Sequence, residues 1–221
     1  SVTLPASLTG ISSYAFCDCT SLESIAIPEG VTRINDYTFQ NCKSLENVEF
    51  PETLTYIDYA AFRNCKSLKT LELPAGLTGM SNYAFSGCSS LGTLTIPGSL
   101  KIIPDYAFAD CKSLTTLTLS RGVTTISNYA FRGCTSLQNI SMVSVAKIES
   151  GAFSGCTSLA SINLPEFLNT LGDAAFSGCT ALETIVIPEN IVEVSDSLFS
   201  GCTSLHQVTF SPDTKKIGNS V

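Results

Sequence analysis

The ten cysteines are the residues of this 221-residue sequence best suited to covalent or metal chemistry. Equivalent cysteines of a regular repeat stack about 5 Å apart, a separation that a disulfide tolerates. Stacked side chains point in the same direction, however, and one cysteine in each repeat lacks the spacing of zinc ligands. The sequence therefore predicts a buried row of reduced thiols, with Cys17, which lies outside the repeat, more exposed. The nine cysteines that recur are Cys19, Cys42, Cys65, Cys88, Cys111, Cys134, Cys156, Cys179 and Cys202.

The other residues that could take part in catalysis are the single histidine and a group of glutamates, and neither forms an evident catalytic site. The single histidine, His206, has no evident partner for a Ser or Cys relay, so a solvated strand residue is expected there. Carboxylates recur as Glu23, Glu46, Glu49 and Glu72, and their repeat spacing favours a solvated acidic face over a paired acid and base. No Gly-rich phosphate loop follows a strand. The expectation is a protein without enzymatic activity, cofactor or metal.

The composition excludes two classes of binding partner, nucleic acid and the membrane interior. Charged residues make up 14% of the sequence, the net charge is -7, and no basic stripe is present to neutralise phosphates. Nucleic acid is therefore excluded as a partner. No apolar run approaches the roughly 18 to 20 residues that span a bilayer, so membrane insertion by this segment is not expected. A hydrophobic content of 44% is sufficient for a continuous core.

A repeat organises the whole chain. A phenylalanine stands three residues before each recurring cysteine and a leucine three residues after it. The copies follow at a constant step, as from Phe16 to Phe39, except that Phe153 comes one residue early after Phe131. The nine phenylalanines are Phe16, Phe39, Phe62, Phe85, Phe108, Phe131, Phe153, Phe176 and Phe199. Self-similarity at this period, about 23 residues, is typical of stacked repeat proteins.

The segment after each cysteine predicts a short strand. Residues 21–28, for example, alternate apolar with small or polar side chains and stop at Pro28, which cannot donate to a strand ladder. A second apolar pair follows, such as Val31 and Ile34, and suggests another short strand on the opposite wall.

The segment before each cysteine predicts a single helical turn. Good N-cap residues stand three before the phenylalanine, at Ser13, Asp36, Asn82, Asp105, Asn128, Ser150, Asp173 and Asp196. Residues that tolerate positive φ stand two after it, at Asp18, Asn41, Asn64, Gly87, Asp110, Gly133, Gly155, Gly178 and Gly201. A start and a stop this close leave room for one turn.

Such a unit cannot bury an apolar face alone, so the copies must stack. We predict an α/β repeat solenoid, with a parallel sheet of short strands on one face and short helical turns on the other. Residues 1–221 form a single domain of about nine repeats, and the chain opens and stops inside a repeat, as a fragment of a longer protein would. The shorter step suggests a change of curvature near residues 142–153.

The unit from Leu73 to Pro97 resembles the BspA-like class of leucine-rich repeat, and its variants cover essentially all of the chain. The resemblance implies a curved leucine-rich-repeat superhelix. It also implies an extracellular or cell-surface protein of host-associated bacteria, a class in which several members are adhesins. A non-enzymatic module that binds a protein or glycan on a host or microbial surface is therefore expected.

The outward strand positions indicate where such a module would bind. They lie eight and ten residues after each phenylalanine and form a mostly uncharged polar row. Threonine also suits any exposed strand, so a passive spacer that presents another domain is the alternative. The only carboxylates between Leu73 and Ile148 are Asp105 and Asp110, both at turn ends. We therefore predict a ligand-binding surface at Thr93, Thr95, Thr116, Thr118, Asn139 and Ser141.

Overall fold

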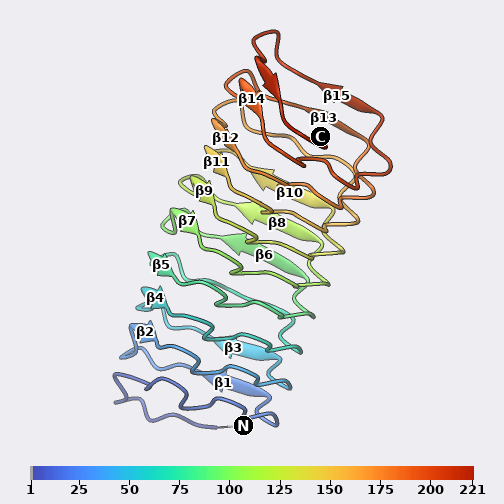
Figure 1. Cartoon of the computed structure of the whole chain (residues 1–221). Helices are drawn as coiled ribbons and strands as arrows, with labels where there is room; N and C mark the ends of the chain where they lie inside the picture. The colour runs from blue at the N-terminus through green and yellow to red at the C-terminus, as the bar shows by residue number, and fades with distance from the viewer. Residues whose placement is uncertain (1) are drawn as a thin grey trace.

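The computed structural model describes residues 2–221 as an elongated stack of repeats, each carrying its strands in the same two rows (Figure 1). The first row holds β1 (Ser24–Ala26), β3 (Asn47–Glu49), β6 (Thr93–Ile96), β8 (Thr116–Leu119), β10 (Asn139–Met142), β13 (Thr184–Val186) and β15 (Gln207–Thr209). The second row holds β2 (Arg33–Ile34), β4 (Tyr56–Ile57), β5 (Gly79–Met80), β7 (Ile102–Ile103), β9 (Thr125–Ile126), β11 (Lys147–Ile148), β12 (Thr170–Leu171), β14 (Glu193–Val194) and β16 (Lys216–Ile217). All pairings are parallel and join equivalent residues of neighbouring repeats, which confirms both predicted strands.

The first row is not the continuous sheet that the repeat predicts. It divides into β1-β3, β10-β8-β6 and β13-β15, while residues 70–73 and 161–164 form no strand. The second row divides into β2-β4-β5, β12-β11-β9-β7 and β14-β16. Both rows are therefore open between the repeat of residues 70–80 and that of residues 93–103. They are open again between residues 161–171 and 184–194, apart from one bridge from Ser161 to Thr184.

The predicted helical turns are wrong, because residues 2–221 contain no helix. The residue after each expected N-cap has a φ between 54° and 62°, a left-handed conformation that a right-handed helix cannot include. The predicted positive φ at the end of each segment is confirmed, with values from 59° to 78°. The wall opposite the strands is thus a series of tight turns. We call it the turn wall.

Successive backbone N–H groups on the turn wall donate alternately to the next repeat and to a carbonyl of their own turn. The N–H of Phe131 donates to Ala152 O of the next repeat at 2.9 Å, whereas the N–H of Arg132 donates within its own turn to Tyr129 O at 3.1 Å. The expected cap residues also act between repeats. Asp105 Oδ1 accepts a hydrogen bond from the N–H of Asn128 at 3.0 Å. Asp36, Asp173 and Asp196 accept equivalent hydrogen bonds from the next repeat. These carboxylates hold neighbouring repeats together, which explains why an acceptor recurs at this position.

Phenylalanine rings and cysteine thiols fill the core between the strands and the turn wall. The rings stack along the molecule with centroid separations from 5.0 to 6.2 Å. Seven of the rings are fully buried, and Phe16 and Phe199 lie near the two ends of the stack. Each recurring thiol from Cys42 onward donates to the carbonyl of a phenylalanine in the preceding repeat, from 3.0 Å for Cys42 to 3.5 Å for Cys111.

All ten cysteines are free thiols, and seven of the nine recurring ones are buried as predicted. The prediction was wrong at the two ends of the row, because Cys19 is exposed and Cys202 partly exposed, and Cys17 is less exposed than Cys19. Burial raises the pKa of Cys42 and Cys179 to about 12. Without reductant, we expect a thiol reagent to count ten thiols in the denatured protein. In the native protein we expect reaction at Cys17, Cys19 and Cys202 only, since the other seven are buried. A denatured count of eight or fewer would show that disulfides form.

The shorter step between Phe131 and Phe153 removes one residue from the turn between β10 and β11. Other repeats close this turn with a hydrogen bond, such as that from Val123 N to Ser120 O at 3.2 Å. The strands β11 and β9 still pair in the common register across the short repeat. The deletion is therefore absorbed within the turn, and the second row continues through residues 142–153.

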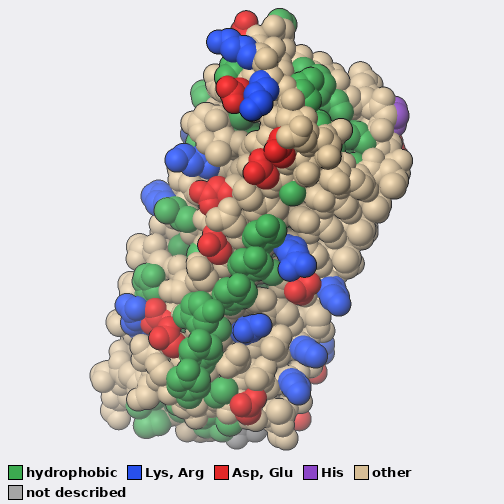
Figure 2. Space-filling view, in the orientation of Figure 1, with side chains coloured by type: hydrophobic (Ala, Val, Ile, Leu, Met, Phe, Trp, Pro, Cys, Tyr) green, Lys and Arg blue, Asp and Glu red, His purple; other side chains and the backbone are tan. Residues whose placement is uncertain are grey.

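A row of tyrosines covers part of the turn wall. Tyr83 and Tyr106 stack at 4.7 Å, and Tyr106 and Tyr129 at 5.0 Å. The row ends where Gly151 follows, because the Tyr129 ring occupies the space that a Cβ of this glycine would need. Figure 2 shows a band of hydrophobic side chains along the N-terminal part of the molecule, with basic side chains beside it.

Candidate ligand-binding surface on the strand face

The six residues predicted to bind a ligand lie together on the longest sheet of the first row (Figure 1). Parallel pairing places Thr93 beside Thr116 and Thr116 beside Asn139. The same register aligns Thr95, Thr118 and Ser141. We call these two lines of side chains the polar rows: Thr93, Thr95, Thr116, Thr118, Asn139 and Ser141.

Strand alternation explains this arrangement. Along β6 and β8, leucine and isoleucine side chains enter the core while each threonine faces outward. Thr116 and Thr118 are partly exposed, and the other four side chains of the polar rows are exposed. None of the six side chains makes a hydrogen bond to another group of residues 2–221. Their hydroxyl and amide groups are therefore available as donors and acceptors for a ligand.

A shallow cleft of about 220 Å³ adjoins the polar rows. It lies between β10 and residues 161–163 and includes three polar side chains that the sequence prediction left out, Gln138, Ser161 and Asn163. Ser161 and Asn163 stand at the same outward positions of their repeat as the predicted residues. The repeat pattern alone was therefore sufficient to extend the surface by one unit.

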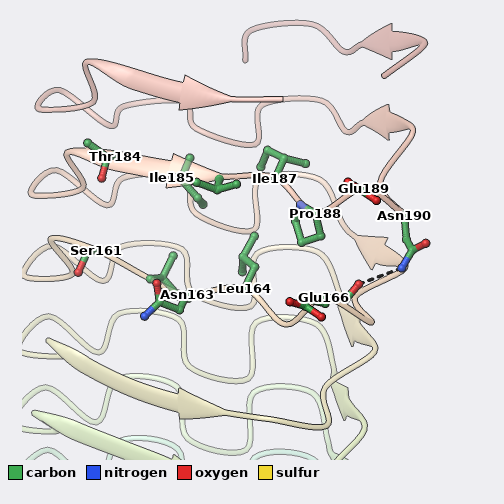
Figure 3. A pocket seen from close by; sticks show the side chains of 12 residues that line it. Ser161, Asn163, Leu164, Glu166, Thr184, Ile185, Ile187, Pro188, Glu189 and Asn190 are labelled. Carbon is green, nitrogen blue, oxygen red and sulfur yellow. Dashed lines mark hydrogen bonds between the residues drawn. The ribbon is translucent and has the colours of Figure 1, made fainter. Parts of the chain in front are cut away.

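A larger cleft of about 590 Å³ lies farther along the strand face, and the sequence did not predict it. It separates residues 161–166 from residues 184–190 (Figure 3). Beyond the Ser161–Thr184 bridge the two segments are not paired, and aliphatic side chains line the cleft between them. One signal was present in the sequence, since Val186 interrupts the outward polar residues of the first row and is 64% exposed.

The acidic residues of the N-terminal repeats are solvated, as predicted. Glu23, Glu46, Glu49 and Glu72 are all exposed, and Glu46 forms an ion pair with Lys69 Nζ at 2.8 Å. Glu49 and Glu72 line opposite sides of a cleft of about 460 Å³ between β3 and residues 70–75. Like charges on neighbouring strands repel each other, which favours the open pairing at this point.

The sequence candidates for catalysis or metal binding are the single histidine and the core thiols. His206 is exposed, and its Nδ1 lies 3.2 Å from the carbonyl oxygen of Ser204. Within residues 2–221, no three His, Cys, Asp or Glu side chains gather as metal ligands would. Burial raises the pKa of the core thiols Cys88 and Cys134 well above the ordinary value, so these thiols are poor nucleophiles. This part of the chain also has no helix that could cross a membrane.

Solved structures of bacterial repeat proteins resemble the chain. A leucine-rich cell surface protein of Faecalibacterium prausnitzii is 31% identical, with 90% of this chain and 62% of that chain covered and a TM-score of 0.60. A leucine-rich repeat protein of T. pallidum is 30% identical, with coverages of 82% and 77% and a TM-score of 0.67. A leucine-rich repeat protein of Bacteroides ovatus, at 24% identity, shares the fold over 98% of this chain and 74% of that chain, with a TM-score of 0.61.

No curated protein matches the chain. The chain spans 62% of the length of the Faecalibacterium protein. A family model described as the BspA type leucine-rich repeat region matches residues 1–115 and 101–221, in six copies. Leucine-rich repeat families are generally non-catalytic repeat scaffolds. The chain therefore belongs to the BspA-type leucine-rich repeat proteins.

Proposed function

We propose that this chain is a non-enzymatic binding module of an extracellular or cell-surface bacterial protein. It engages a protein or glycan on a host or microbial surface through the polar rows. The observation that carries the proposal is the six aligned side chains, which face solvent and make no hydrogen bond within residues 2–221. Solenoids commonly bind through such an extended face.

The chemistry of the polar rows suits a neutral, hydrogen-bonding partner. Hydroxyl and amide groups both donate and accept hydrogen bonds, so they match sugar hydroxyls or an exposed protein backbone. No carboxylate lies on β6, β8 or β10. A strongly charged ligand would find no counter-charge there. Support for a surface location comes from the Faecalibacterium relative, which is described as a cell surface protein.

A substitution pair tests the proposal. Thr116→Arg with Thr118→Arg places two bulky cations at the centre of the polar rows, and both positions are solvent-facing, so the fold should persist. We expect the unmodified chain to bind one or more extracellular-matrix proteins, mucins or glycans in an array, and the variant to lose at least tenfold in affinity. The measurement is a binding screen of both proteins, with circular dichroism to show that both are folded.

A matched control separates the polar rows from general surface charge. Thr32→Arg with Thr55→Arg adds the same charge at exposed positions outside the first row and should leave binding unchanged. Absence of binding by all three folded proteins would favour the passive spacer that presents another domain. Equal loss in both variants would show that charge, and not the polar rows, controls binding.

A further inference from the structure

The cleft between residues 161–166 and 184–190 combines features that the polar rows lack (Figure 3). Its volume of about 590 Å³ falls within the range of ligand pockets, about 300 to 1,000 Å³. It lies at one of the two places where both strand rows are open, so beyond the Ser161–Thr184 bridge its two walls do not pair with each other.

Aliphatic side chains form the centre of the cleft. On one side of the cleft lies Leu164, which is half-buried. Its side chain points toward the segment that carries Ile187 and Pro188 (Figure 3). Val186 lines the other side and is 64% exposed. Phe167, next to the cleft residue Glu166, is 71% exposed. Exposed apolar side chains beside polar ones, as Val186 and Leu164 are in this cleft, are typical of an interaction site.

The backbone along one side of the cleft has no sheet partner. Asn163 and Leu164 belong to no strand, and their main-chain groups make no backbone hydrogen bond to β10 or β13 among residues 2–221. Equivalent residues of β8 pair on both sides. Free N–H and C=O groups beside an apolar surface are what an extended peptide uses when it binds next to a strand.

Two carboxylates stand at one end of the cleft. Glu166 and Glu189 are both exposed, and within residues 2–221 neither forms an ion pair. A hydrogen bond of 2.9 Å from Asn190 Nδ2 to Glu166 O holds the two loops together at this end (Figure 3). The residues lining the cleft include no Lys or Arg, so its electrostatic field favours a cation.

We propose that this cleft binds an extended segment of a protein partner in which aliphatic side chains are followed by lysine or arginine. The aliphatic side chains contact Leu164 and Val186, the peptide backbone satisfies the free groups of Leu164, and the cation lies between Glu166 and Glu189. The site is separate from the polar rows and adds a protein partner of defined chemistry to the proposed binding function.

Fluorescence anisotropy with a defined probe tests the proposal. The probe is a labelled short peptide of alternating valine and threonine that ends in two lysines, and its partner probe ends in two glutamates. We expect the lysine peptide alone to bind, and added salt to weaken it. Glu166→Gln with Glu189→Gln should reduce its affinity roughly twofold to thirtyfold, because two exposed ion pairs are lost and each contributes about 0.2 to 1 kcal/mol.

Two controls complete the experiment. Glu183→Gln with Glu193→Gln removes the same charge from exposed positions that do not line the cleft, and should leave binding unchanged. Thr116→Arg with Thr118→Arg should also leave it unchanged, so a failure of the polar rows is distinguishable from a failure of the cleft. Absence of lysine-peptide binding, equal binding of both peptides, or equal loss in the Glu183/Glu193 control would overturn the proposal.

Discussion

Above about pH 9, we expect the free energy of unfolding to fall steeply. Burial raises the pKa of the core thiols well above 9.0, and raises that of Cys179 to about 12. These thiols stay protonated in the folded chain while their unfolded counterparts ionise. Their contribution to stability is therefore complete below pH 9 and is lost as the pH rises toward the folded pKa. The seven thiols concerned are Cys42, Cys65, Cys88, Cys111, Cys134, Cys156 and Cys179.

The size of the effect follows from linkage. Each such thiol removes about 1.4 kcal/mol per pH unit, so seven remove roughly 10 kcal/mol per unit. Native domains have only about 5 to 15 kcal/mol in total, so unfolding should follow within about two units above pH 9. The measurement is the urea midpoint, monitored by circular dichroism, over a series of pH values.

Cysteine variants identify the groups responsible. Cys111→Ala with Cys134→Ala removes two of the seven thiols and should reduce the pH slope by roughly three tenths. Cys19→Ala removes an exposed thiol and should leave the slope unchanged. Constant stability up to about pH 11, or an unchanged slope in the double variant, would contradict the assignment of this effect to the core thiols.

Phe108→Ala should cause a large loss of stability at neutral pH. The ring is fully buried and stacks between Phe85 at 5.5 Å and Phe131 at 5.6 Å. Removing a buried phenylalanine costs about 3 to 5 kcal/mol through lost transfer energy and the cavity that remains. Because each repeat contacts only its neighbours, the loss weakens both adjoining interfaces. Urea denaturation at pH 7 measures the change.

Phe199→Ala is the matched control for this experiment. Phe199 has one ring neighbour, Phe176, at 6.2 Å, and is 5% exposed near the end of the stack. We expect this substitution to cost less than Phe108→Ala, since only one stacking partner is lost. An equal or greater cost at Phe199 would show that the stack is not stabilised by nearest-neighbour contacts.

The strands and the thiol row were predictable because they depend on features that recur in each copy. Leu117 and Leu119 enter the core because side chains alternate along a strand, and the same rule directs Thr116 and Thr118 outward. The alignment of the polar rows followed from the constant period of the repeat, since equivalent positions stack.

The turn wall was misjudged because its residues suit two conformations. Aspartate and glycine occur at the two ends of helices, and they also stabilise stacked turns, as Asp105 and Gly133 do here. The distinguishing feature is the positive φ of 55° at Tyr106, which is uncommon outside glycine, asparagine and aspartate. Contacts between neighbouring copies compensate for this conformation, and a single repeat read alone does not reveal them.

The clefts were unpredictable because they depend on pairs of repeats. Residues 70–73 and 161–164 have the alternation of a strand but are not paired. Repulsion between Glu49 and Glu72 disfavours pairing of residues 70–73 with β3. Residues 161–164 have no comparable explanation in the structure.

The two places where both strand rows are open give the molecule lines along which it can bend. At each of them the turn wall remains bonded, as from Phe85 N to Ala107 O at 2.8 Å and from Gly178 N to Ser200 O at 2.7 Å. On the strand side each place is crossed by few backbone hydrogen bonds, such as those from Gly92 N to Lys69 O at 3.2 Å and from Glu183 N to Ala160 O at 3.0 Å. Few hydrogen bonds therefore oppose a change in the width of the strand-face clefts at these places, so the binding face can adapt its curvature to a partner.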